Sequence, residues 1–151
     1  MKINGIAHII LTVTNPKESI LFYEKVFQFL EFETVYKREK GAYFVGGKTA
    51  IGIMPADDQF KKEGFTQTRV GLHHLCFRAY SREDVDRFHQ HLSHLGAKVV
   101  HPPEEGSWAP GYYSVLFEDP DGIRLEMNFV PGKGLLAGDA QFKPVGYENL
   151  E

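Results

Sequence analysis

The sequence predicts an α+β fold built from two βαβββ modules that are related by a pseudo-twofold axis. The first observation is a repeated strand pattern, in which a histidine precedes alternating, mostly apolar positions at residues 8–13 and again at 74–79. The second is that a helical pattern and further strand-like runs follow each copy. The third is the offset, because His8 and His74 are 66 positions apart and four helical apolar positions recur at an offset of 65. These agreements indicate an internal repeat.

The first module is expected over about residues 4–54. β-branched and apolar residues predict a buried strand over 6–13. Asn15, Pro16 and Glu18 supply a helix N-cap, a proline in the first turn and an acid three residues after the cap. Apolar residues spaced three, four and three apart then predict a helix. The expected helix covers 16–27, and the expected strands that follow it cover 29–37, 42–45 and 49–54.

The second module is expected over about residues 70–130, after a polar linker over about 55–69. Ser81 and Asp84 form a second capping signal and predict the start of a helix there. Gly96 is a natural stop for this helix. The tail, 131–151, has no clear period and is expected to be partly disordered, to wrap a partner or to cover a site. We expect one domain over 1–151, with strands in the second module over 70–79, 97–101, 112–118 and 123–130 and a hairpin turn at 119–122.

Composition favours a small-molecule enzyme or binding protein. The chain has 151 residues, 42% of them hydrophobic and 25% charged, which is ordinary for a soluble globular protein. A net charge of −3 gives no electrostatic case for nucleic acid or an anionic membrane as partner. The single cysteine, Cys76, excludes an internal disulfide and fits a reducing compartment. With neither an apolar signal core nor a run of transmembrane length, a cytoplasmic location is the default expectation.

Three residues predict a metal site. Because side chains alternate along a strand, His8, His74 and Glu126 each fall on the more polar face of their strands. A single histidine in such a strand is usually a hydrogen-bonded core residue. Equivalent histidines in two repeats, together with a carboxylate on an otherwise apolar strand, instead favour a divalent metal with open coordination positions.

Four segments carry a family resemblance: Ala7-His8-Ile9, Phe22-Tyr23-Glu24-Lys25-Val26, Gly71-Leu72-His73-His74-Leu75, and Phe117-Glu118-Asp119-Pro120-Asp121-Gly122-Ile123-Arg124-Leu125-Glu126. On these, over about residues 4–130, the chain resembles the vicinal-oxygen-chelate superfamily. That superfamily includes glyoxalase I, methylmalonyl-CoA epimerase, fosfomycin-resistance enzymes, extradiol dioxygenases and bleomycin-resistance proteins. The resemblance implies a curved mixed sheet that cups a metal held by His8, His74 and Glu126. It further implies a homodimer and a divalent ion (Zn, Ni, Mn or Fe), among which the sequence does not choose.

Departures from the family pattern narrow the site. Glyoxalase I and the epimerase take a fourth ligand from the first module, at a position that corresponds here to Gly52 or Ile51, and neither residue can bind metal. Extradiol dioxygenases and fosfomycin-resistance enzymes carry a tyrosine where this chain has Leu116. The fosfomycin thiol transferases also differ at Ile10 and Ile123. We therefore expect an open site with three protein ligands.

Further residues are assigned by their place on the predicted strands. Arg78 and Arg124 are expected at the rim of the cup, either to bind an anionic group of the substrate or to pair with acidic neighbours. Trp108, Tyr112 and Ser114 either line the pocket or belong to the core. Several polar residues receive plainer roles: Cys76 as a small side chain inside the cup, His73 toward the helix layer, and Glu104, Glu105, Glu118, His89, His91 and His94 as solvated groups.

The preferred hypothesis is a divalent-metal-dependent lyase or isomerase of glyoxalase type. Its substrate is a small molecule that chelates the metal through adjacent oxygens, with Glu126 as the catalytic carboxylate. An Fe(II)-dependent extradiol-type dioxygenase and a non-catalytic small-molecule-binding resistance protein are the alternatives.

Overall fold

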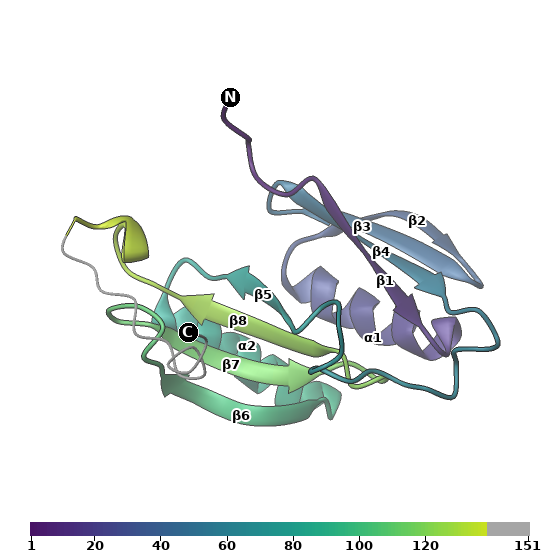
Figure 1. Ribbon diagram of the computed structural model, residues 1–151. Helices are drawn as coiled ribbons and strands as arrows, with labels where there is room; N and C mark the ends of the chain where they lie inside the picture. The colour runs from purple at the N-terminus through teal and green to yellow at the C-terminus, as the bar shows by residue number, and fades with distance from the viewer. Residues whose placement is uncertain (139–151) are drawn as a thin grey trace. The chain divides into compact units, whose positions relative to one another are not determined.

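The computed structural model describes residues 1–138 and divides the chain into two units, each with one helix and one four-stranded mixed sheet (Figure 1). The first unit comprises Met1–Thr66 with Asp119–Ile123, and the second comprises Gln67–Glu118 with the chain from Arg124 onward. Each unit has the order βαβββ, so the predicted α+β fold of two such modules is confirmed. None of the helices within residues 1–138 is long and apolar enough to cross a membrane.

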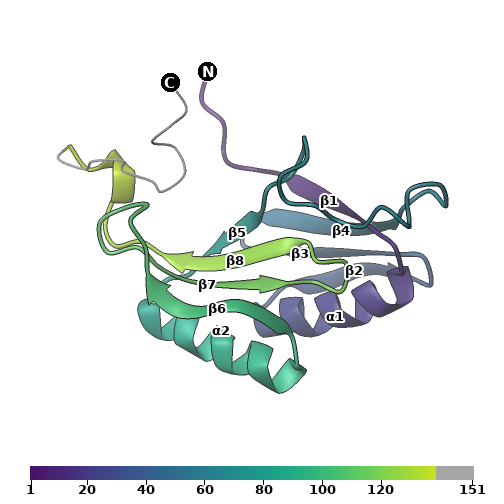
Figure 2. The ribbon, with the colours of Figure 1, turned by 60° about the horizontal axis from the view of Figure 1, so that its bottom comes forward.

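The first unit packs helix α1 on one face of its sheet (Figure 2). Strand β1 runs parallel to β4, and the pairs β4–β3 and β3–β2 are antiparallel. Tyr23 and Phe27 on α1 are fully buried, and Phe27 packs on Phe44 of β3 with ring centroids 5.1 Å apart. The bounds are β1 His8–Val13, α1 Pro16–Phe29, β2 Glu33–Arg38, β3 Gly41–Gly46 and β4 Thr49–Pro55.

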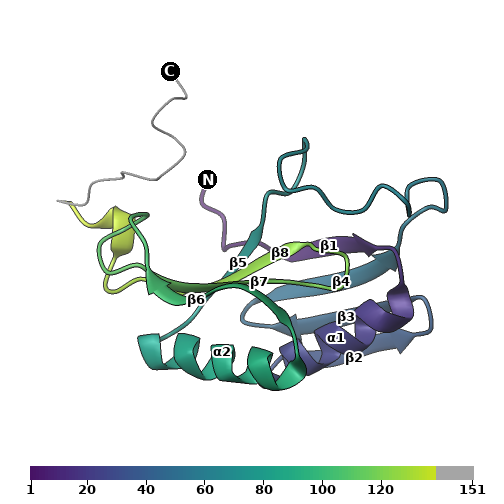
Figure 3. The same ribbon diagram turned by 90° about the horizontal axis from the view of Figure 1, so that it is seen from below.

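The second unit repeats this arrangement, with α2 covering one face of its sheet (Figure 3). Strand β5 runs parallel to β8, and β8–β7 and β7–β6 are antiparallel. Phe88 of α2 meets Phe117 of β7 edge to face at 5.4 Å. The bounds are β5 Leu75–Arg78, α2 Arg82–Leu95, β6 Lys98–Glu105, β7 Tyr113–Glu118, β8 Arg124–Phe129 and the 3-10 helix η1 Gly134–Leu136.

Both helices begin where the sequence predicts. The side chain of Asn15 accepts a hydrogen bond from the backbone N–H of Glu18, and Ser81 accepts one from that of Asp84. These caps satisfy N–H groups that have no partner within the helix. Gly96 ends α2 with φ +65°, a left-handed conformation that glycine adopts without steric cost.

Three predicted strands are corrected by the structure. The strand expected over 29–37 starts only at Glu33, because α1 continues to Phe29 and Glu31 then takes φ +60°. The strand expected over 70–79 is reduced to β5, because its partner β8 begins at Arg124, opposite position 74, and residues 70–73 lie beyond the start of β8. The strand expected over 97–101 extends to Glu105, and its two prolines are tolerated because β6 lies at the edge of the sheet.

The predicted hairpin turn at 119–122 is confirmed and is anchored in the first unit. The Asp119 carboxylate accepts hydrogen bonds from the Tyr23 hydroxyl at 2.8 Å and from the backbone N–H of Ile123 at 2.7 Å. Asp121 accepts from the backbone N–H of Thr14 at 3.0 Å. Burial raises the pKa of Asp119 to about 6, although the hydrogen bonds from Tyr23 and Ile123 act in the opposite direction.

The single domain expected over 1–151, and the expected limits of its two modules and of the linker between them, stay predictions. The tail predicted over 131–151 lies partly outside the described residues, which end at 138.

Candidate metal and substrate site

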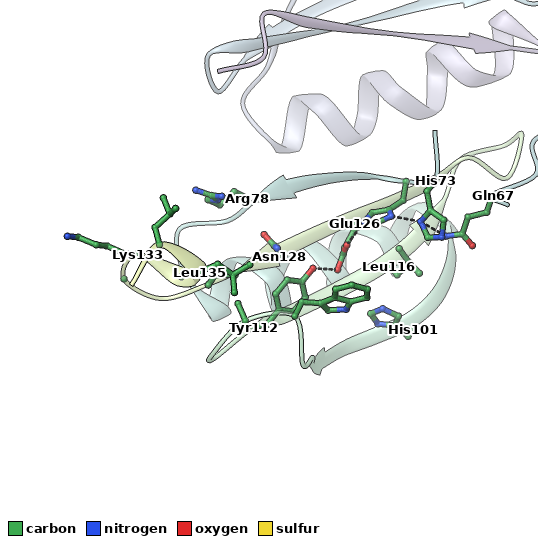
Figure 4. A pocket seen from close by; sticks show the side chains of 17 residues that line it. Gln67, His73, Arg78, His101, Tyr112, Leu116, Glu126, Asn128, Lys133 and Leu135 are labelled. Atoms are coloured by element: carbon green, nitrogen blue, oxygen red, sulfur yellow. Dashed lines mark hydrogen bonds and ion pairs between the residues drawn. The ribbon is translucent and has the colours of Figure 1, made fainter. Parts of the chain in front are cut away.

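The second unit brings His74 and Glu126 together. Nε2 of His74 lies 3.2 Å from Oε2 of Glu126, whose side chain is labelled in Figure 4. Leu125 and Met127, the neighbours of Glu126 on β8, are buried on the helix side of the sheet. Alternation along the strand therefore turns the Glu126 carboxylate to the opposite face, as predicted.

Glu126 is a buried carboxylate that the surrounding donors keep ionised. The Tyr112 hydroxyl donates to Oε1 at 2.6 Å, and Ser114 is buried nearby as a further donor. Burial alone would raise the pKa of Glu126, but hydrogen bonds from His74, Tyr112 and Ser114 lower it to about 2. A charged oxygen in this position is a suitable ligand for a divalent metal.

His73 and Gln67 orient His74 from the other side. Nδ1 of His73 lies 2.7 Å from Nδ1 of His74 and 3.2 Å from the side-chain nitrogen of Gln67. Because the Gln67 amide nitrogen can only donate, Nδ1 of His73 is an acceptor, and the proton between the two rings belongs to Nδ1 of His74. Nε2 of His74 is then the ring atom that faces Glu126, and it is the atom that would bind a metal ion in place of a proton. A metal-binding histidine donates its other N–H to a neighbour in the same way.

Sequence reasoning placed His73 wrongly and missed Gln67. The prediction that His73 points toward the helix layer assumed a strand that includes residue 73, but β5 begins at Leu75 and strand alternation does not apply before it. Both His73 and Gln67 line the same pocket as His74. Gln67 lies in the predicted linker, where no periodic pattern could have identified it.

His8 is the first residue of β1, in the first unit. Leu11 and Val13 are buried while Thr12 is exposed, so the predicted alternation along β1 is confirmed. Neither unit by itself, within residues 1–138, gathers three His, Cys, Asp or Glu side chains that could hold a metal ion. The role of His8 as a third ligand therefore stays a prediction.

The position of the missing fourth ligand is filled by neighbouring side chains. Gly52 on β4 lies between Ile10 of β1 and Tyr43 of β3 in the strand register. A Cβ atom at Gly52 would lie 2.5 Å from Cδ1 of Ile10 and 3.1 Å from Cδ2 of Tyr43. Ile51 is fully buried. A glutamate or glutamine at Gly52 would thus require both neighbours to move.

A pocket of about 1010 Å³ extends from His74 and Glu126 along the second unit (Figure 4). Of the residues predicted to contact substrate, Arg78, Trp108 and Tyr112 line it, whereas Ser114 is buried beside Glu126 and Arg124 is not part of the lining. The remaining lining residues include several that sequence reasoning did not single out for substrate: His101, Leu116, Asn128, Val130, Lys133, Leu135 and Leu136.

Arg124 is engaged in an ion pair, which is the alternative that the sequence left open for it. Its Nε lies 2.8 Å from Oε1 of Glu118, directly across the β7–β8 register, and Lys98 approaches the other oxygen of Glu118 at 2.6 Å. The expectation that Glu118 is solvated is wrong, because its side chain is buried between these two cations. Opposite charges paired across two strands stabilise the sheet at this point.

Cys76 lies opposite Glu126 in the β5–β8 register. Cys76 is an exposed residue, but desolvation of its thiol and the neighbouring Glu126 carboxylate raise the pKa of that thiol above its ordinary value. The thiol therefore stays protonated at neutral pH and is a poor nucleophile.

Comparison with known proteins gives consistent results. The family model of the Glyoxalase/Bleomycin resistance protein/Dioxygenase superfamily matches residues 5–127. The uncharacterized protein YqjT of Bacillus subtilis is 31% identical over 80% of this chain and 94% of its own length. The metallothiol transferase FosB of Shouchella clausii is 31% identical over 83% of this chain and 80% of its own. A solved glyoxylase/bleomycin resistance protein/dioxygenase domain from Frankia superposes with a TM-score of 0.68 at 25% identity, covering 85% of this chain and 98% of that one.

Proposed function

The chain belongs to the glyoxalase/bleomycin resistance protein/dioxygenase superfamily, and from that premise we propose that it is a divalent-metal-dependent enzyme whose ligands are His8, His74 and Glu126. The observation that carries the proposal is the His74–Glu126 pair, in which an ionised buried carboxylate lies 3.2 Å from the Nε2 atom of an oriented histidine. His8 completes a set of two imidazoles and one carboxylate, which suits zinc, nickel, manganese or iron.

The bound metal would supply Lewis-acid stabilisation of negative charge on two adjacent oxygens of a small substrate. Residues of the chain position the carboxylate ligand and line the substrate pocket. Tyr112 holds Oε1 of Glu126 so that Oε2 faces His74. Trp108 and Leu116 line the pocket beside this pair and exclude water from the substrate.

We propose lyase or isomerase chemistry of glyoxalase type as the reaction. Metal-dependent thiol transfer is the second candidate, because the similar protein from Shouchella clausii is a metallothiol transferase. Leu116 argues against the dioxygenase alternative and also against thiol transfer of the fosfomycin-resistance type, because both groups resemble this chain at the triad but carry a tyrosine at that position. Thiol transfer stays the second candidate because of the sequence similarity. The proposal includes a homodimer, which sedimentation of the purified protein tests.

The test is metal binding by the purified protein and matched variants. Calorimetric titration of metal-free protein with Mn²⁺ and Zn²⁺ is expected to show one ion per chain, and His8→Ala and Glu126→Gln are each expected to weaken binding by at least about 100-fold. His94→Ala is the control, because His94 lies on the exposed face of α2. A native protein that binds less than half an ion per chain, or equal affinity in all variants, would contradict the site.

Activity assays then separate the reactions. Turnover of the methylglyoxal–glutathione hemithioacetal to a thioester supports the first candidate. Thiol consumption with an epoxide supports the second, and oxygen uptake with catechol after anaerobic Fe(II) loading would instead favour the dioxygenase.

A further inference from the structure

Arg78 lies on β5, two residues beyond Cys76, which is the register partner of Glu126. In the β5–β8 register Cys76 pairs with Glu126 and Arg78 pairs with Asn128. Two residues of strand advance about 7 Å and return to the same face of the sheet. Arg78 and Asn128 therefore follow Glu126 along the pocket, and Figure 4 shows Arg78 and Lys133 toward one end with His73 and Gln67 toward the other.

That end of the pocket has positive charge without a counter-ion among residues 1–138. No hydrogen bond or ion pair joins Arg78 or Lys133 to another side chain within residues 1–138, although both line the pocket. The contrast with other arginines of this unit is clear, since ion pairs to carboxylates are made by Arg82, Arg87 and Arg124. A free guanidinium beside the Asn128 amide is suited to bind an oxyanion through two or more hydrogen bonds.

Part of the pocket wall is apolar. Trp108, Leu116, Val130 and Leu135 line the pocket. A Cβ atom at Gly106 would lie 3.2 Å from the Trp108 ring, so glycine at this position lets the ring lie close to the loop backbone. A volume of about 1010 Å³ is at the upper end of the range for sites that bind organic molecules, and an inorganic ion alone would leave this wall without contacts.

We propose that the substrate is an amphipathic anion, whose carboxylate, phosphonate or phosphate group is bound by Arg78 and Lys133 and whose apolar body packs against Trp108 and Leu135. This inference rests on the proposed function, because it assigns the substrate class of the same site. A cationic substrate would be repelled at this end, and a neutral one would leave both cations without a partner.

Trp108 makes the inference directly measurable, because it is the only tryptophan of the chain and lines the pocket. The probes are 4-phenylbutyrate, its neutral analogue 4-phenylbutanol, and inorganic phosphate, each titrated into metal-free protein while Trp108 fluorescence is recorded. We expect 4-phenylbutyrate to bind at least about 10-fold more tightly than the alcohol, a ratio that converts to about 1.4 kcal/mol. The ratio should shrink as salt is raised from about 50 to 500 mM, because salt screens the charges.

The variants locate the effect. Arg78→Gln is expected to remove most of the preference for the carboxylate, and Lys133→Gln part of it. Arg87→Gln is the matched control, since Arg87 pairs with Asp84 on α2 and does not line the pocket. Thermal unfolding checks that Arg78→Gln remains folded; because Arg78 has no intramolecular partner among the described residues, its melting temperature should match the native one.

Three results would overturn the inference. They are equal affinity for the alcohol and the carboxylate, an unchanged ratio in Arg78→Gln, and inorganic phosphate binding as tightly as 4-phenylbutyrate. Because the protein in these titrations is metal-free, the results do not depend on the metal site. Conversely, failure of the Mn²⁺ and Zn²⁺ titrations with the charge preference intact would refute the enzyme proposal and leave an anion-binding pocket.

Discussion

Tyr112→Phe isolates the contribution of one hydroxyl to the charge on Glu126. The hydroxyl donates to Oε1 at 2.6 Å, both side chains are buried, and a phenylalanine ring occupies nearly the same volume. The substitution therefore removes a hydrogen bond to a charged acceptor and changes little else. Because His74 and Ser114 still donate to Glu126, the carboxylate retains part of its stabilisation.

The expected magnitude follows from the strength of such a bond. A hydrogen bond to a charged group contributes about 1.5–3 kcal/mol, and one pKa unit corresponds to about 1.4 kcal/mol, so the pKa of Glu126 should rise by about one to two units. Starting from a pKa of about 2, it should reach about 3–4 in the variant. The free energy of unfolding at pH 7, where the carboxylate is ionised in both proteins, should fall by a similar 1.5–3 kcal/mol or so.

Carboxyl ¹³C NMR of metal-free protein measures the titration, with Glu126→Gln identifying the resonance. Tyr113→Phe is the matched control, because the neighbouring hydroxyl donates to Asp86 at 2.7 Å and not to Glu126. The reasoning is refuted if Glu126 in folded Tyr112→Phe titrates within about 0.3 units of the native protein, or if Tyr113→Phe shifts it equally.

Three further outcomes are expected. Arg124→Met should lower the free energy of unfolding by about 1–3 kcal/mol in urea titrations, because Glu118 keeps only Lys98 as partner, while probe binding at Trp108 stays unchanged; weaker probe binding would contradict this. His73→Ala should weaken Mn²⁺ binding by about 10–100-fold without changing metal stoichiometry, because the ligand histidine loses its acceptor. Asp119 has a pKa raised to about 6 from 3.8, so its ionised form costs stability above pH 6 and protonation removes that cost. Relative to Asp119→Asn, native unfolding free energy should therefore rise by roughly 2–3 kcal/mol from pH 7 to pH 4, and a flat difference would refute the pKa.

The sequence predicted correctly those features that depend on residues close together along the chain. The caps at Asn15 and Ser81 and the stop at Gly96 act within one helical turn of their own residues. Alternation along β8 placed Glu126 opposite the helix face without knowledge of any partner strand. The same reasoning failed for the strand over 70–79, whose length depends on where β8 begins.

The structure brings two of the three predicted ligands close together. His74 and Glu126 come together because β5, which begins directly after His74, runs parallel to and beside β8, which carries Glu126. His73 and Gln67 precede the strand, in a segment without period, and nothing in their spacing indicated that they contact His74. The ligand set of His8, His74 and Glu126 remains a proposal.

The sequence by itself determined the two βαβββ modules, the starts of both helices, the end of α2, and the strand faces on which His8 and Glu126 lie. These follow from side-chain period and capping, which depend on neighbours within a few positions along the chain. Only the tertiary structure decided which charges are neutralised: both Arg78 and Arg124 were candidates for an anion, and the register places Glu118 across from Arg124 while leaving Arg78 beside Asn128. Ion pairs form between residues brought close in space, so their partners depend on strand register, which a single sequence does not specify.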